Sequence, residues 1–184
     1  MIKQQKYITN YLDKRSLYSA LIAAKPASNL SLIVTIPCYN ESGLLDTLNS
    51  LRQCELPLRK SVEVIVLINN AIDAGLAIQQ QNELTFQTAQ NWSNENSISN
   101  LRFHILYHKD LATKNAGVGL ARKITMDEAV RRFDAIEHPN GIIACLDADS
   151  LVEKTYFQAI CDFFHQHPSC PAANIYYEHP LEGM

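Results

Sequence analysis

Two carboxylates, Asp147 and Asp149, follow an apolar run of strand length that begins at Gly141. In an extended segment, side chains two positions apart point to the same side, so these two are a candidate pair of oxygen ligands. Mg²⁺ and Mn²⁺ favour carboxylate, water and phosphate oxygens. Asp-x-Asp after a strand is also a common turn and helix cap, so the pair alone leaves a metal site and a simple turn both open.

The elements that position this pair are predicted from apolar runs that alternate with helical patterns. Strands are expected at 30–37, 62–68, 101–107, 141–147 and, as a further possibility, 172–177. The strand before Asp147 is expected at the centre of the sheet and 101–107 nearer its edge. Helices are expected at 1–25, 43–52, 117–137 and 155–167. A further helix is expected to follow a cap at Asp73 and to extend over much of 79–100.

Strands that alternate with helices, without a hairpin signal, predict a mostly parallel sheet that is covered by helices and joined by right-handed crossovers. Ligands of such sheets bind beyond the carboxyl ends of the strands. Four segments follow those ends here, namely 37–41, 69–70, 107–119 and 147–149. We therefore expect them to converge on one rim of the sheet.

Length and composition are those of one ordinary globular domain, with 184 residues of which 47% are hydrophobic. A formal charge of -3 gives no electrostatic reason to expect a nucleic-acid partner. No run of eighteen apolar residues and no secretion signal is found. The five cysteines never form Cys-x-x-Cys, which favours buried free thiols in a reducing cytoplasm.

The first 25 residues are expected to form an amphipathic helix with tyrosines and leucines along one side and lysines largely elsewhere, ended by Pro26. Such a helix either packs on its own domain or lies on an anionic membrane surface, as a peripheral contact at the inner face. Residues 1–29 are thus expected to be a helix and linker that precede a domain of residues 30–184.

Three motifs, taken in order, carry a resemblance to a known family. They are Thr-Ile-Pro-Cys-Tyr-Asn-Glu at 35–41, Lys-Asn-Ala-Gly-Val-Gly-Leu-Ala-Arg at 114–122, and Leu-Asp-Ala-Asp-Ser at 146–150. With these motifs, the chain resembles the family 2 glycosyltransferases of the GT-A fold over roughly residues 30–155. The resemblance implies a Rossmann-like three-layer α/β/α fold that binds a nucleotide-sugar donor and transfers its sugar, with inversion, to an acceptor hydroxyl.

The resemblance also implies roles for individual residues. Asp149 would ligate Mg²⁺ or Mn²⁺ on the donor diphosphate, and Asp147 would approach the ribose or the metal. The glycine turn and the helix start at Gly117 favour the approach of an anion, to which Arg122 could add a bidentate contact. The remaining donor contacts implied are Pro37, Tyr39, Asn40, Glu41 and Asn70.

Two departures from the family pattern stand out. Asn69-Asn70-Ala71 replaces the acidic residues that in the family recognise the base, and an amide both donates and accepts where a carboxylate only accepts. The later acidic motif that supplies the general base has no counterpart after Ala172, so the acceptor part of the family's domain is missing from 30–184 and the base is unidentified. Glu178 and His179 are the remaining candidates for a base or a metal ligand. The other five histidines, His104, His108, His138, His165 and His167, show no metal-ligand spacing.

Two alternatives remain open. One is nucleotidyl transfer onto a sugar phosphate, although the segment 37–43 lacks the Lys or Arg usual in the phosphate loop of such enzymes. The other is a non-catalytic module that binds a nucleotide sugar. Release of pyrophosphate would distinguish the first, and retained nucleotide affinity without transfer would distinguish the second.

Overall fold

The computed structural model describes residues 2–178. Four parallel strands form one sheet in the order β3-β2-β1-β4. The strands are β1 (Leu30–Cys38), β2 (Ser61–Ala71), β3 (Leu101–Leu111) and β4 (Ile142–Cys145). The helices are α1 (Ile2–Arg15), α2 (Leu44–Arg52), α3 (Leu76–Asn96), the 3-10 turn η1 (Thr113–Asn115), α4 (Val118–Asp134) and α5 (Tyr156–Gln166).

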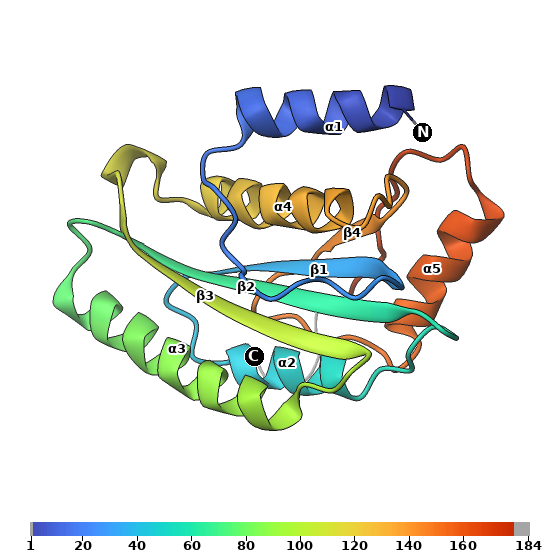
Figure 1. Ribbon diagram of the computed structural model, residues 1–184. Coiled ribbons are helices and arrows are strands. Elements are labelled where there is room, and N and C mark those ends of the chain that lie inside the picture. Colours follow the sequence, from blue (N-terminus) through green and yellow to red (C-terminus); the bar gives the residue numbers. More distant parts are fainter. Residues whose placement is uncertain (1, 179–184) are drawn as a thin grey trace.

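The sheet lies between two helical layers, with α2 and α3 on one face and α4, covered by α1, on the other (Figure 1). Alternate residues of β1 serve the two faces: Val34 and Ile36 join the core on the α2 face, and Ile33 joins the core below α4. Because β1 is buried on both faces, its sequence is a continuous apolar run rather than an alternating one. The predicted three-layer α/β/α fold with a parallel sheet is confirmed.

The outer parts of the sheet differ from the prediction. The strand before the two aspartates, β4, pairs only with β1 and therefore lies at an edge of the sheet formed by the described residues, not at its centre. The expected strand at 172–177 is absent, since residues 167–178 form no helix or strand. Their apolar side chains, such as Ile175 and Tyr176, are exposed and have no core to pack against.

The expected N-terminal helix is ten residues too long, because α1 ends at Arg15 and residues 16–25 continue without helix. This segment 16–25 is fixed by charged side chains of α4. The Glu128 carboxylate accepts the N–H groups of Leu21 and Ile22 at 3.0 and 3.2 Å, and Arg132 donates to the carbonyl of Ala24 at 2.9 Å. A helix would have used these backbone groups internally, so tertiary hydrogen bonds override the local pattern.

Helix α1 packs on its own domain, as one of the two interpretations expected. The hydroxyl of Tyr11 donates to Asp127 of α4 at 2.8 Å, and Lys123 forms an ion pair with the same carboxylate. None of the helices in residues 2–178 combines the length and the apolar character needed to span a bilayer.

A buried charge cluster lies beneath the segment 16–25. Arg132 of α4 binds Glu63 of β2 through both carboxylate oxygens, and the two side chains are 3% and 2% exposed. His104 Nε2 lies 3.6 Å from the same carboxylate. Burial acts to raise the pKa of Glu63, but His104 and Arg132 outweigh it, so that the pKa lies below its ordinary value.

The cysteines are free thiols. Cys38, Cys54 and Cys161 are buried as expected, whereas Cys145 is exposed at the end of β4. Burial, with the nearby charge of Glu41, raises the pKa of Cys38 to about 12, and burial raises that of Cys54 to about 11. These two thiols are therefore protonated and unreactive at neutral pH.

Candidate functional site

The carboxyl ends of β1 and β4 are neighbours at the point where the strand order reverses. The chain continues from β1 to β2 on one side, whereas β4 joins β1 on the other. Ligands of open parallel sheets bind at such a switch point. The segments that follow these strands are 39–43 and 146–150, and β3 leads through η1 into the start of α4 at the same end of the sheet, on the left of Figure 1. We call the three segments 39–43, 112–122 and 146–150 the rim.

Asp147 and Asp149 lie in a tight turn beyond β4, not in an extended segment as expected. The N–H of Ser150 donates to the carbonyl of Asp147 at 3.2 Å, which closes the turn. Ala148 between them is buried, and its carbonyl accepts from Thr47 Oγ1 of α2 at 2.8 Å. Because the intervening residue is anchored inward, both carboxylates are presented to solvent.

The two carboxylates have different surroundings. Arg122, in the second turn of α4, donates through Nη2 to Asp147 Oδ1 and forms an ion pair with it. The side chains are 37% and 59% exposed, so this pair is accessible to solvent. The Asp149 carboxylate has no hydrogen bond or ion pair with any residue in the described range. The rim therefore holds three carboxylates, those of Glu41, Asp147 and Asp149, and two cationic side chains, Lys114 and Arg122, which give it a formal net charge of -1.

The start of α4 is an open helix N-terminus. Gly117 is its N-cap, with φ -93°, and no side chain caps the first N–H groups. A Cβ added at Gly117 or Gly119 would meet nothing within 4 Å, so packing within the chain does not require glycine at either position. Free N–H groups and the helix dipole favour an anion at this end.

The loop after β1 is held by α3. Asn40 adopts a left-handed conformation, with φ 51°, and donates its N–H to Asn82 Oδ1 at 2.8 Å. Thr85 Oγ1 donates to the carbonyl of Glu41 at 3.0 Å, and the Glu41 carboxylate accepts from the N–H of Gly43 at 2.7 Å. The Tyr39 ring is 48% exposed and thus available at the rim rather than packed in the core.

Pro37 occupies a different place from its neighbours in the motif. It is a buried residue of β1, paired with Leu67 of β2. The pairing of β1 with β4 ends at Thr35, so the missing N–H of the proline interrupts no ladder on that side. Its role toward a ligand can only be to place the loop that follows.

Asn70 is 3% exposed and its amide is bonded within the protein. Its Oδ1 accepts from the Tyr107 hydroxyl at 2.8 Å, and its Nδ2 donates to the carbonyl of Lys109 at 2.8 Å. Strand β2 also runs through Asn69 and Asn70 to Ala71 instead of stopping before them. The structure therefore places Asn70 beside the rim as a buried link between β2 and β3.

The neighbouring Asn69 joins this network to the glycine segment. Its Nδ2 donates to the carbonyl of Ala116 at 3.3 Å, while its buried Oδ1 has no partner among the described residues. The expected helix cap at Asp73 is wrong, because α3 begins after Gly75 and Asp73 instead accepts from Thr113 of η1 at 2.7 Å. The ends of β2 and β3 are thus tied together by side chains.

Asn82 fixes the loop after β1 and was not among the candidate residues predicted from the sequence. It is fully buried and joins the loop after β1 to β2, since its Nδ2 donates to the carbonyl of Asn69 at 3.1 Å. Its helix is rich in amides throughout, so one buried asparagine gives little signal. The only indication is that Asn82, Thr85, Ala89 and Ser93 recur at helical spacing, a buried face made of small and polar residues.

We expect Asn82→Ala to lower the free energy of unfolding by about 2–3 kcal/mol, because the Asn40 N–H loses its acceptor and the carbonyl of the buried residue Asn69 loses a donor. Urea denaturation measures this loss, and hydrogen exchange should show faster exchange at Asn40. Asn91→Ala is the matched control, since Asn91 is exposed on the same helix. Equal stability of the two variants would contradict a role for Asn82 in holding the loop.

The candidate metal ligands at the described part of the rim are the two exposed aspartates, Asp147 and Asp149. Among residues 2–178, no group of three or more His, Cys, Asp or Glu side chains is placed to hold a metal ion. Two exposed carboxylates fit a hard cation that draws its other ligands from a diphosphate and water. Glu178 is exposed and accepts from Tyr176 at 2.6 Å, and His179 lies outside the described residues, so neither is assigned a role.

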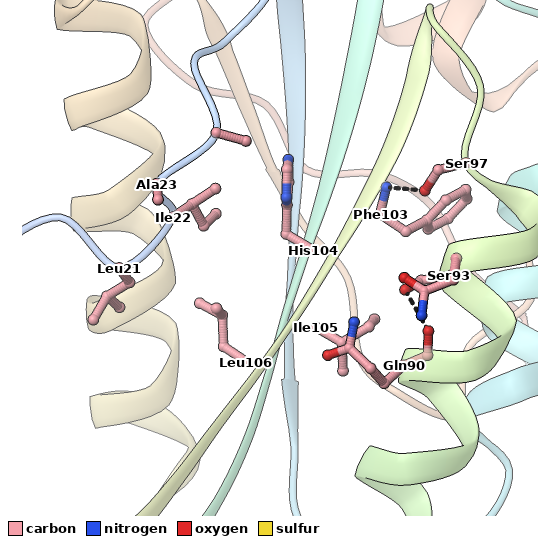
Figure 2. A pocket seen from close by; sticks show the side chains of 12 residues that line it. Leu21, Ile22, Ala23, Gln90, Ser93, Ser97, Phe103, His104, Ile105 and Leu106 are labelled. Carbon is pink, nitrogen blue, oxygen red and sulfur yellow. Dashed lines mark hydrogen bonds between the residues drawn. The ribbon is translucent and has the colours of Figure 1, made fainter.

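A cavity of about 440 Å³ lies elsewhere, between the segment 16–25 and α3, over the free edge of β3 (Figure 2). In Figure 2, His104 lies on the side of Ile22 and Ala23, whereas Phe103 points toward α3. The N–H of Phe103 donates to Oγ of Ser97, the residue that follows α3. This cavity shares no residue with the rim. The candidate site is therefore placed at the rim by its chemistry, not by the volume of a cavity.

The backbone is similar to that of TarS from S. aureus. The structure of TarS residues 1–349 has 21% identity and a TM-score of 0.48, covering 75% of this chain and 33% of that one. The same protein in complex with UDP-GlcNAc has 21% identity and a TM-score of 0.45, covering 75% and 32%. A mannosyltransferase from Pyrobaculum calidifontis, in complex with GDP-Man and Mn²⁺, has 16% identity and a TM-score of 0.41, covering 89% and 39%.

This chain thus spans about a third of the length of the TarS structure. No protein-family model and no curated protein matches the sequence.

Proposed function

We propose that this chain is the donor-binding part of a family 2 glycosyltransferase and holds a nucleotide sugar at the rim. The observation that carries the proposal is the meeting of two exposed carboxylates, one guanidinium and an open helix N-terminus at the switch point between β1 and β4. The carboxylates suit a cation and the other two groups suit phosphate, so together they match a metal-bound diphosphate.

The chemistry supports sugar transfer. A nucleoside diphosphate that leaves a sugar gains negative charge, and Mg²⁺ or Mn²⁺ held by Asp149 and Asp147 would neutralise it. The first N–H groups of α4 and the Arg122 side chain would stabilise the same charge on the phosphate oxygens. An acceptor hydroxyl would attack the anomeric carbon from the opposite side, with inversion. The base that deprotonates it is assigned to no described residue.

The nucleoside is proposed to lie against the loop 39–41. Tyr39 offers an exposed ring for contact with the base or ribose, and the backbone around Asn40 is fixed by Asn82. The Asn70 amide is occupied by partners in β3, so we propose that it links β2 to β3 rather than reads the base. Which base is bound therefore depends on the loop itself.

The location proposed is the cytoplasm, with peripheral contact at the inner face of the membrane through residues 1–25. The free cysteines support a reducing compartment. Helix α1 exposes Lys6, Tyr7, Lys14 and Arg15, a combination of cationic and aromatic side chains suited to an anionic surface.

Calorimetric titration with UDP, GDP and dTDP, each with and without Mn²⁺, tests the proposed function. We expect one of the three to bind in the presence of Mn²⁺ and to bind at least about tenfold more weakly without it, because the cation bridges diphosphate and carboxylates. Absence of binding by all three, with the metal present, would contradict a donor site in this chain.

A further inference from the structure

The ion pair between Arg122 and Asp147 sets the two rim carboxylates apart. Asp147 already carries a cationic partner, whereas Asp149, two residues further, has none among the described residues. A divalent cation that used both carboxylates would meet the Arg122 guanidinium at Asp147. Two cations cannot share one exposed carboxylate oxygen without repulsion, so Arg122 and the metal compete for Asp147.

Arg122 is also within reach of the place where a diphosphate would bind. It lies five residues after Gly117, the N-cap of α4, and so stands one turn above the free N–H groups. Its Nε is buried and has no hydrogen-bond partner within residues 2–178, so the guanidinium is only partly used by Asp147. A guanidinium group can bind a phosphate group through two parallel hydrogen bonds, and such hydrogen bonds between charged groups are stronger than those between neutral groups.

We propose that Arg122 couples the binding of the metal to the binding of the nucleotide by changing partners. Without donor, it neutralises Asp147 and opposes the metal. When a nucleoside diphosphate arrives, Arg122 moves to the phosphate oxygens and releases Asp147 to the cation. The metal and the nucleotide therefore bind together much more tightly than either binds alone. This inference rests on the proposed function and adds to it the residue that makes the two ligands cooperative.

The coupling has a measurable consequence of opposite sign for the two ligands. In Arg122→Gln, Mn²⁺ alone should bind more tightly than in the unchanged protein, by up to about fivefold, the range expected for removing an exposed ion pair. The nucleoside diphosphate should bind more weakly, and the factor by which each ligand improves the other should fall about fivefold or more. Linkage requires that this factor be the same whichever ligand is added first.

The experiment measures free Mn²⁺ by its electron paramagnetic resonance signal during titration of the protein, first alone and then with saturating UDP, GDP or dTDP. Lys123→Gln is the control. It removes the same charge from the next residue of α4, but the Lys123 side chain forms its ion pair with Asp127 and not with Asp147. Arg122→Lys keeps the charge and loses the fork, so it should retain the competition with Mn²⁺ and recover only part of the coupling.

Each result decides the question. Tighter binding of Mn²⁺ alone together with reduced coupling in Arg122→Gln, and neither change in Lys123→Gln, supports the partner exchange. Cooperative binding that is unchanged in Arg122→Gln overturns the exchange and leaves the donor site in place. Absence of cooperative binding in the unchanged protein overturns both the exchange and the proposed function.

Discussion

Asp149→Ala is expected to abolish the Mn²⁺-dependent part of nucleotide binding, a loss on the order of 100-fold in affinity or more, since even residues that only support metal ligands affect affinity by 10–100-fold. The carboxylate is exposed and bonded to nothing among the described residues, so the fold should be unaffected and the free energy of unfolding should change by less than about 0.5 kcal/mol. Calorimetry with and without Mn²⁺ measures the first effect and urea denaturation the second.

Asp110→Ala is the control for this substitution. Asp110 is an exposed aspartate near the carboxyl end of β3, and it lies on the strand furthest from β4 in the sheet. We expect the Asp110→Ala variant to keep its metal-dependent nucleotide affinity. Chelation of the metal by EDTA should remove that affinity from both this variant and the unchanged protein. If Asp149→Ala and Asp110→Ala behaved alike, the metal site would have to be placed elsewhere.

Arg132→Met is expected to lower the free energy of unfolding at pH 7 by about 3–5 kcal/mol, because it leaves the buried carboxylate of Glu63 without its main partner. The substitution also removes the donor to the Ala24 carbonyl, so the segment 16–25 should exchange its amides faster. Urea denaturation measures the first effect and hydrogen exchange the second. The double change Glu63→Leu with Arg132→Met should recover most of the loss, since no unpaired charge then remains buried.

The pH dependence of this loss follows from the sign of the Glu63 pKa shift. In the unchanged protein the folded-state pKa lies below the unfolded value of about 4.3. The ion pair therefore stabilises the protein fully above that value, and its contribution is lost as the pH falls through the folded pKa. In Arg132→Met, burial dominates and the Glu63 pKa rises, so the loss of stability should shrink from pH 7 toward pH 4. A loss independent of pH would mean that packing, not charge, is responsible.

The fold was predictable where the apolar runs are continuous. The strands around Val34 and Val64 are buried on both faces, and their β-branched runs leave no other interpretation. Prediction failed where a tertiary contact replaced a local one. The sequence of residues 16–25 has a helical pattern, but Glu128 and Arg132 take its backbone groups, and no local pattern shows that these partners are more than 100 residues away.

The candidate site was predictable as a set of segments but not as a geometry. The two aspartates were found from their spacing, yet they lie in a turn whose inner residue is fixed by Thr47, which is 101 residues distant. The asparagine at position 70 was assigned by its place in a motif, and only the structure shows that its amide is already used by Tyr107. Burial decides whether a polar side chain can contact a bound molecule or only stabilises the fold, and burial depends on packing between distant parts of the chain.

The attachment of residues 21–24 to α4 also has a consequence for folding during synthesis of the chain. Leu21 and Glu128 are 107 positions apart, and a ribosome that adds about 5–20 residues per second needs roughly 5–20 s to travel from one to the other. During that interval the segment 16–25 has been synthesised, whereas the part of α4 that binds it has not. Leu21 and Ile22, which later cover the sheet, are then bare apolar side chains on a nascent chain. The segment 16–25 is therefore synthesised before the helix whose side chains fix it.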